Sequence, residues 1–217
     1  VFSNSYKEDR TEFSLNLAAS LFQETHQKTI LVDLDPPGAS VSVKRHQAKK
    51  YPLAQFVNIE SGPTDALKNF LTSHSIGFDI LNITHQEKDV TDEDIITSIL
   101  NYLAIDYRFI LMNLPGYLDE AIFKSMSQSD FIFFATDSQL NNVTEIKDVS
   151  SDIQKNLSFP EDKISIVIHE AVFGIRTTTS ARREIFGKKF CYSLPATQEL
   201  GDAESTSFTP LVASDPD

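Results

Sequence analysis

The chain has 217 residues, of which 41% are hydrophobic and 10% aromatic, enough for the core of one α/β domain or of two small ones. Its formal net charge of -12 argues against a protein that grips nucleic acid through the phosphates, because such binding needs a basic face. The one cysteine, Cys191, excludes an internal disulfide, and with no secretory signal we expect a reducing cytoplasm. No apolar run approaches the ~20 residues of a membrane span.

Short apolar runs alternate with amphipathic stretches along the chain, which is typical of a parallel sheet covered by helices. After a strand end at residues 1–3, the runs predict buried strands at 29–34, 78–81, 109–114, 131–135, 164–168 and 190–194. The amphipathic stretches predict helices at 12–27, 92–103, 118–126, 141–153 and 179–186. The sequence therefore predicts an α/β fold with a doubly wound, mostly parallel sheet flanked by helices.

The alternation runs from end to end without a linker, which favours a single domain over residues 1–217. Val1 stands inside a predicted strand, and no closing helix precedes Asp217, so we expect a domain truncated at both ends of a longer protein. Cys191 falls in a predicted strand, where we expect a small buried residue and not a nucleophile.

Polar side chains stand where the predicted strands end. They are Asp33, Asp35, Asn113, Asp137 and His169. Because ligands of doubly wound sheets bind at the carboxyl ends of the strands, we expect the functional site at this edge.

The segment that joins the first strand to the first helix lacks glycine. We expect a loop over residues 5–12, in the place where such folds bind phosphate, yet the first glycine of the chain is Gly38. A phosphate-binding loop needs glycines, because its backbone N–H groups must turn inward and approach the ligand. The order of elements thus indicates a nucleotide-binding scaffold, whereas this segment argues against ATP hydrolysis.

Four segments carry a resemblance to a known family. They read NLAA at 16–19, LVDLDPPG at 31–38, YRFILMNLPG at 107–116 and SDFIFFAT at 129–136. The chain resembles the MinD/ParA-type ATPases, a P-loop NTPase superfamily with a deviant loop of form K-G-G-x-G-K-T-T. It looks closest to the CpaE/TadZ-like branch, which helps to position pilus and secretion machinery. The resemblance spans essentially the whole chain and implies a P-loop NTPase-like fold.

Carried onto this sequence, the resemblance shows a pattern of losses. Ser5 stands at the signature lysine that reaches a partner's nucleotide, and Tyr6 and Lys7 stand at the first two glycines. Asp9 replaces the third glycine. His169 replaces the asparagine that reads the adenine. The losses therefore affect functionally separate parts of the site.

Five residues form what the resemblance implies is a remnant nucleotide site without function. Arg10 replaces the phosphate-binding lysine, and Thr11 keeps the magnesium-coordinating threonine. Asp35 keeps the switch-one aspartate, whereas the switch-two aspartate has become Asn113. Asp33 either keeps a role in the site or caps a loop at the strand end. We expect no catalytic residue and no metal ligand.

The altered segment opposes triphosphate binding in physical terms. Non-glycine residues are strained at positive φ, and their side chains fill space that phosphates need. Three carboxylates, on Glu8, Asp9 and Glu12, are offset only by Lys7 and Arg10. A close pair of like charges in a partly dry cleft costs ~1–4 kcal/mol.

The sequence leaves two main functions open. The first is a degenerate (pseudo-)ATPase domain that needs no cofactor and acts as a scaffold or regulator through protein–protein contacts. It would work in an envelope assembly such as a pilus or secretion system, as a cytoplasmic protein that partners recruit to the inner membrane or cell pole. The alternative is a slow nucleotide switch that dimerises with ATP and uses Arg10, Thr11 and Asp35. The resemblance allows a homodimer in either case, and the net charge opposes a third reading as a ParA-like DNA-binding protein.

Overall fold

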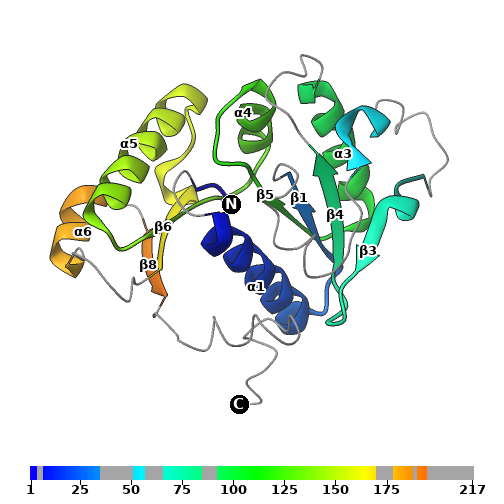
Figure 1. Ribbon diagram of the computed structural model, residues 1–217, viewed down its shortest axis with the longest axis horizontal. Coiled ribbons are helices and arrows are strands. Elements are labelled where there is room, and N and C mark those ends of the chain that lie inside the picture. The colour runs from blue at the N-terminus through cyan, green and yellow to red at the C-terminus, as the bar shows by residue number, and fades with distance from the viewer. Residues whose placement is uncertain are drawn as a thin grey trace.

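The computed structural model describes residues 1–3, 7–34, 51–56, 66–84, 92–169, 178–187 and 190–194 (Figure 1). The helices are α1 (Lys7–Thr25), α3 (Asp92–Asp106), α4 (Glu120–Ser127), α5 (Leu140–Leu157) and α6 (Thr179–Phe186), with short 3-10 turns at Leu53–Phe56, Ala66–Phe70 and Glu161–Lys163. The strands are β1 (Thr29–Asp33), β2 (Tyr51–Pro52), β3 (Leu71–Ser73), β4 (Asp79–Thr84), β5 (Phe109–Asn113), β6 (Ile132–Asp137), β7 (Ile164–His169) and β8 (Phe190–Leu194).

The strands form two sheets that lie side by side. The first has the order β2-β4-β1-β5, all parallel, with β3 antiparallel on the outer edge of β4. The second has the order β6-β7-β8 and is parallel throughout. Parallel neighbours require crossover connections, and helices supply them, since α4 lies between β5 and β6 and α5 between β6 and β7.

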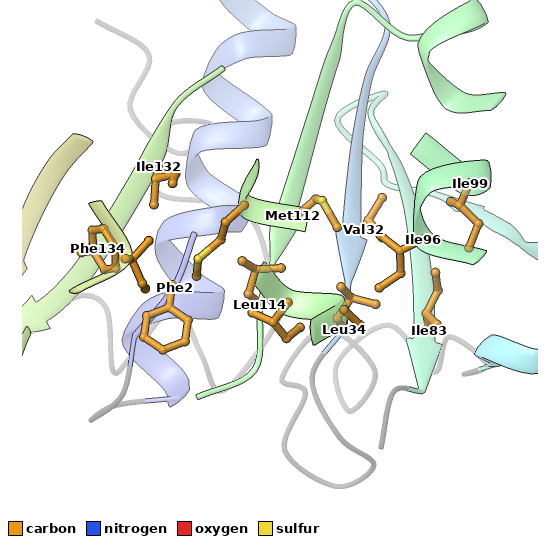
Figure 2. Close-up of a cluster of buried hydrophobic side chains, with 14 of the residues drawn as sticks. Phe2, Val32, Leu34, Ile83, Ile96, Ile99, Met112, Leu114, Ile132 and Phe134 are labelled. Carbon is orange, nitrogen blue, oxygen red and sulfur yellow. The ribbon is translucent and has the colours of Figure 1, made fainter. Parts of the chain in front are cut away.

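Residues 1–3 join the two sheets. The nitrogen of Val1 donates to the carbonyl of Met112 on β5 at 2.6 Å. The N–H of Phe2 donates to the carbonyl of Phe133 on β6 at 2.9 Å. Figure 1 places the N-terminus between the β5 and β6 ribbons. In Figure 2 the ring of Phe2 lies between Phe134 and Leu114, so the side chains bridge the same seam.

The two faces of the first sheet bury different side chains of the same strands. Along β1 and just beyond it, Ile30, Val32 and Leu34 enter the large core, which α3, α4 and α5 also line (Figure 2). Leu31 points to the other face and packs under α1. This period of two is what a strand buried on both faces must show, and it explains the continuous apolar runs in the sequence.

The α/β prediction is confirmed, including all six predicted strands and five predicted helices, with boundaries that shift by a few residues. The main error concerns the predicted loop over residues 5–12, since α1 already begins at Lys7. Acidic residues are common in the first turn of a helix, and the sequence has two of them at positions 8 and 9. Strands β2 and β3 are too short to show periodicity and were not predicted.

The prediction for Cys191 is wrong. Strand β8 is where the sequence places it, but the side chain of Cys191 is exposed. Among the described strands β8 has only β7 as a neighbour, so its side chains gain less cover than those of a central strand.

The turn between β3 and β4 depends on Gly77, which has φ +115 and would place a Cβ 2.6 Å from the ring of Phe22 on α1. We expect Gly77→Ala to lower the free energy of unfolding by about 2–3 kcal/mol, because it adds backbone strain to a steric clash. Gly187→Ala is the matched control, since Gly187 has φ +63 but open space around it. There we expect about 1 kcal/mol. Equal losses in urea denaturation would contradict the clash.

Candidate functional site

The carboxyl edge of the strands gathers the polar residues that the sequence singled out. Asp33, Asn113, Asp137 and His169 are the last residues of β1, β5, β6 and β7. Asp35 lies outside the described residues. The prediction that these side chains share one edge is therefore confirmed for four of the five.

The start of α1 brings two further site residues to this edge. Arg10 and Thr11 lie in its first turns and are both 0% exposed. Asp33 and Asn113 are also 0% exposed. Four of the five residues of the predicted remnant site thus meet in one buried cluster, which we call the Asn113 network.

Asn113 is the centre of this network. Its Nδ2 donates to Thr11 Oγ1 at 3.1 Å and to Asp33 Oδ1 at 3.0 Å. Its Oδ1 accepts from Arg10 Nε at 3.0 Å, and Ser14 Oγ lies 3.4 Å from the same oxygen. An asparagine amide has a donor end and an acceptor end, and both ends are engaged here.

The orientation of the amide suits the charges on either side of it. The oxygen end of Asn113 faces the guanidinium of Arg10, and the nitrogen end faces the carboxylate of Asp33. Arg10 Nη1 also donates to the carbonyl of Ser3 at 3.0 Å. Because a buried ion without partners costs several kcal/mol, these contacts allow one cation and one anion to be removed from water together.

Sequence reasoning missed Ser14 and the carbonyl of Ser3. Ser14 Oγ donates to the carbonyl of Arg10 at 2.9 Å, as serines often do one turn along a helix. The spacing of four residues from Arg10 was a usable signal for Ser14. Nothing in the sequence marks a backbone carbonyl such as that of Ser3.

The other strand-end residues have separate roles. Asp137 accepts from the N–H of Gln139 and from Asn142 Nδ2, both at 2.8 Å, and so supports the turn into α5. The ring of His169 packs edge-on against Phe13 of α1, with ring centroids 6.4 Å apart. His169, placed at the adenine-reading position by the resemblance, is thus in contact with the helix that carries Arg10.

The structure describes only part of residues 5–12, the segment that stands in the place of the phosphate-binding loop. Residues 4–6 lie outside the described part of the chain, as do the side chains of residues 7–9. Within the described residues, no three His, Cys, Asp or Glu side chains are grouped so as to hold a metal ion. None of the helices described has both the length and the apolar character to cross a membrane.

Comparison with known proteins identifies the fold. No protein-family model and no curated protein matches the sequence. Among solved structures, a ParA family ATPase from Chlorobium tepidum matches with a TM-score of 0.77 and 15% identity, over 94% of this chain and 86% of the other. The chain has the ParA/MinD fold.

Two further structures support this assignment. MinD from Aquifex aeolicus matches with a TM-score of 0.70 and 13% identity, over 97% of this chain and 86% of its own. Apo McdA from Cyanthece matches with a TM-score of 0.65 and 10% identity, over 100% and 92%. The resemblance seen in the sequence is therefore confirmed at the level of the ParA/MinD fold.

The Asn113 network generates a sharp mutational test. We expect Asn113→Asp, which restores the acidic residue of the ATPases, to lower the free energy of unfolding by about 2–4 kcal/mol. The change removes both Nδ2 hydrogen bonds and sets a second carboxylate beside Asp33. Urea denaturation measures the loss.

The matched control is Asn101→Asp, the same substitution at an exposed position of α3. Here we expect a change within about 0.5 kcal/mol. An equally small loss for Asn113→Asp would show that the amide is not the centre of the network.

Proposed function

We propose that this domain is a degenerate member of the ParA/MinD fold that does not use ATP and works through protein–protein contacts as a scaffold or regulator. The observation that carries the proposal is the state of Arg10. The residue at the phosphate-binding position is fully buried and donates inward, to Asn113 and to the carbonyl of Ser3.

A phosphate would have to compete with these bonds. For Arg10 to reach a nucleotide, its guanidinium must leave Asn113 Oδ1 and the Ser3 carbonyl, and each buried group left unpaired costs about 1–3 kcal/mol. The absence of glycine before Gly38 adds to this cost, since the backbone cannot easily form a cradle of N–H groups.

The oxygens that could bind a magnesium ion already accept hydrogen bonds. The hydroxyl of Thr11 and the carboxylate of Asp33 both accept hydrogen bonds from Asn113. Magnesium requires near-octahedral oxygen ligands, and the cationic Arg10 on the other side of Asn113 repels it. The residues present thus fit a hydrogen-bonded polar core better than Mg-ATP.

The proposal that this domain binds other proteins rests on its fold and not on the residues of the Asn113 network. One similar structure is a MinC:MinD cell division complex from Aquifex aeolicus, with a TM-score of 0.70. We propose that this domain likewise binds other proteins in a positioning role. The resemblance to the CpaE/TadZ-like branch suggests an envelope assembly such as a pilus, with recruitment from the cytoplasm to the inner membrane or pole.

The alternative is a nucleotide switch, and one observation favours it. Thr11 and Asp33, both polar residues of the expected site, remain side by side as partners of a single amide. The fold itself can hold nucleotide, since a similar plasmid partition protein from Borrelia burgdorferi is bound to AMPPNP.

Calorimetric titration with ATP and magnesium separates the two functions. We expect no heat above dilution at up to about 1 mM nucleotide, that is, a binding free energy weaker than about -4 kcal/mol. A nucleotide-binding MinD protein in the same buffer is the positive control. Micromolar binding that Arg10→Ala abolishes would establish the switch instead.

The oligomeric state gives an independent test. Without a nucleotide to join two copies, we expect the same sedimentation coefficient with ATP, with ADP and without nucleotide, whether the chain is a monomer or a dimer. A dimer that forms only with ATP would contradict the scaffold model even if its turnover were undetectable.

A further inference from the structure

The turn that joins β3 to β4 lies against the last turns of α1 (Figure 1). The ring of Phe22 packs so closely on Gly77 that a Cβ there would come within 2.6 Å of it. Ile76 adds its partly buried side chain to the apolar cluster under α1. The N–H of His74 donates to the carbonyl of Phe78 at 2.8 Å, and the N–H of Gly77 donates to the carbonyl of His74 at 2.9 Å. The backbone of His74 thus holds the turn closed.

The side chain of His74 adds a hydrogen bond that depends on its protonation state. Its Nδ1 accepts from the N–H of Ile76 at 3.2 Å. Because an imidazole nitrogen that accepts a hydrogen bond carries no proton, the ring is neutral, with its hydrogen on Nε2. A proton added to Nδ1 would face the N–H of Ile76, donor against donor, and the hydrogen bond would be lost.

The surroundings of the ring also disfavour a charge. His74 is 5% exposed, and its ring stacks on that of Phe78 with centroids 4.5 Å apart and an angle of 13°. Phe78 is itself fully buried in the apolar cluster under α1. The face of an aromatic ring attracts a cation, but removal from water and loss of the bond from Ile76 both oppose protonation. The closed turn therefore favours a neutral His74.

The charged groups around the turn come from several elements. On β4, Asp79 precedes Ile80, which packs under α1, so the carboxylate points to the opposite face of the sheet and accepts from Tyr107 Oη at 2.7 Å. Glu24 follows Phe22 by two positions and lies on the other side of α1. The remaining charged or titratable residues are exposed: His26 after α1, Lys28 before β1 and Lys68 before β3. The one carboxylate in the sequence of the hairpin is thus directed away from the ring.

We propose that protonation of His74 releases the β3–β4 turn from α1. Loss of the hydrogen bond from Ile76 loosens the turn, which uncovers the apolar side chains of Ile76 and Phe22. Because the open turn binds the proton and the closed turn does not, the open population rises as the pH falls below about 6.5, the ordinary pKa of histidine. The turn precedes β4 and so lies at the amino edge of the sheet, opposite the Asn113 network. The inference therefore goes beyond the proposed scaffold function.

Amide hydrogen exchange at Gly77 measures the opening of the turn. Each observed rate is divided by the intrinsic rate of an unstructured amide at the same pH, which gives an opening constant. We expect this constant to rise roughly tenfold between about pH 7.5 and about pH 5.5. We also expect Leu31 of β1 to open more rarely than Gly77 at both pH values, because the turn opens without the sheet.

Two matched variants assign the effect to one histidine. His74→Asn keeps an acceptor for the N–H two residues on, as asparagine does in turns, but does not titrate in this range. We expect its opening constant at Gly77 to change less than about twofold between the two pH values. His26→Asn removes an exposed histidine at φ +54, which asparagine tolerates, and should retain the tenfold change. A tenfold change that persists in His74→Asn would overturn the proposal, as would equal opening of Gly77 and Leu31.

Nitrogen NMR of the His74 ring in the unaltered chain tests the same point without a substitution. We expect the tautomer with its hydrogen on Nε2 at about pH 7.5, and uptake of a proton at lower pH than at the exposed His26. A ring protonated on Nδ1, or one that gains a proton while the opening constant at Gly77 stays unchanged, would contradict the release even if His74→Asn failed to fold. None of these measurements involves nucleotide, so their failure would leave the proposed scaffold function unaffected.

Discussion

A guanidinium group that is removed from water keeps its charge and must therefore find hydrogen-bond acceptors inside the protein. Arg10 meets this requirement with one side-chain oxygen and one backbone carbonyl, from Asn113 and Ser3. Each of these acceptors belongs to a different part of the fold. Asn113 ends β5, and Ser3 is the last of the three residues that join the two sheets. Since Arg10 itself is on α1, a single side chain connects the helix, the first sheet and the seam.

The amide of Asn113 makes this arrangement compatible with a buried Asp33. An aspartate at the same position would satisfy Arg10 but would present a second negative charge to Asp33. A hydrophobic residue would leave both ions without their shared partner. Only a side chain with a donor end and an acceptor end suits a cation on one side and an anion on the other, and asparagine is short enough to fit between them. The asparagine at the expected magnesium-support position is thus the residue that accepts a hydrogen bond from the inward-pointing Arg10.

The sequence predicted which residues lie at the carboxyl ends of the strands, but not the hydrogen bonds that connect them. Asp33, Asn113, Asp137 and His169 could be placed because each polar residue ends an apolar run, and parallel strands bring such ends together. The Asn113 network could not be predicted, because its bonds join residues 103 and 80 positions apart. The start of α1 was missed for a related reason: the resemblance suggested a loop, whereas residues 7–12 have ordinary helix-forming character without a glycine to interrupt them. The burial of Cys191 was predicted wrongly because a strand pattern does not reveal how well the strand is covered.

In a nucleotide-dependent protein, the contacts at the carboxyl edge exist only while a ligand is bound, so the conformation follows the ligand's concentration. Here Arg10 supplies a positive charge at the same edge through a covalent bond to the chain, and its effective concentration never changes. Under the proposed scaffold function, a site stabilised in this way does not alternate between two states in response to nucleotide, since no ligand distinguishes them. The burial of Arg10 and the loss of glycine from the preceding segment therefore act in the same direction. Both support the proposal of a site that keeps a constant surface, which is the property that a scaffold for other proteins requires.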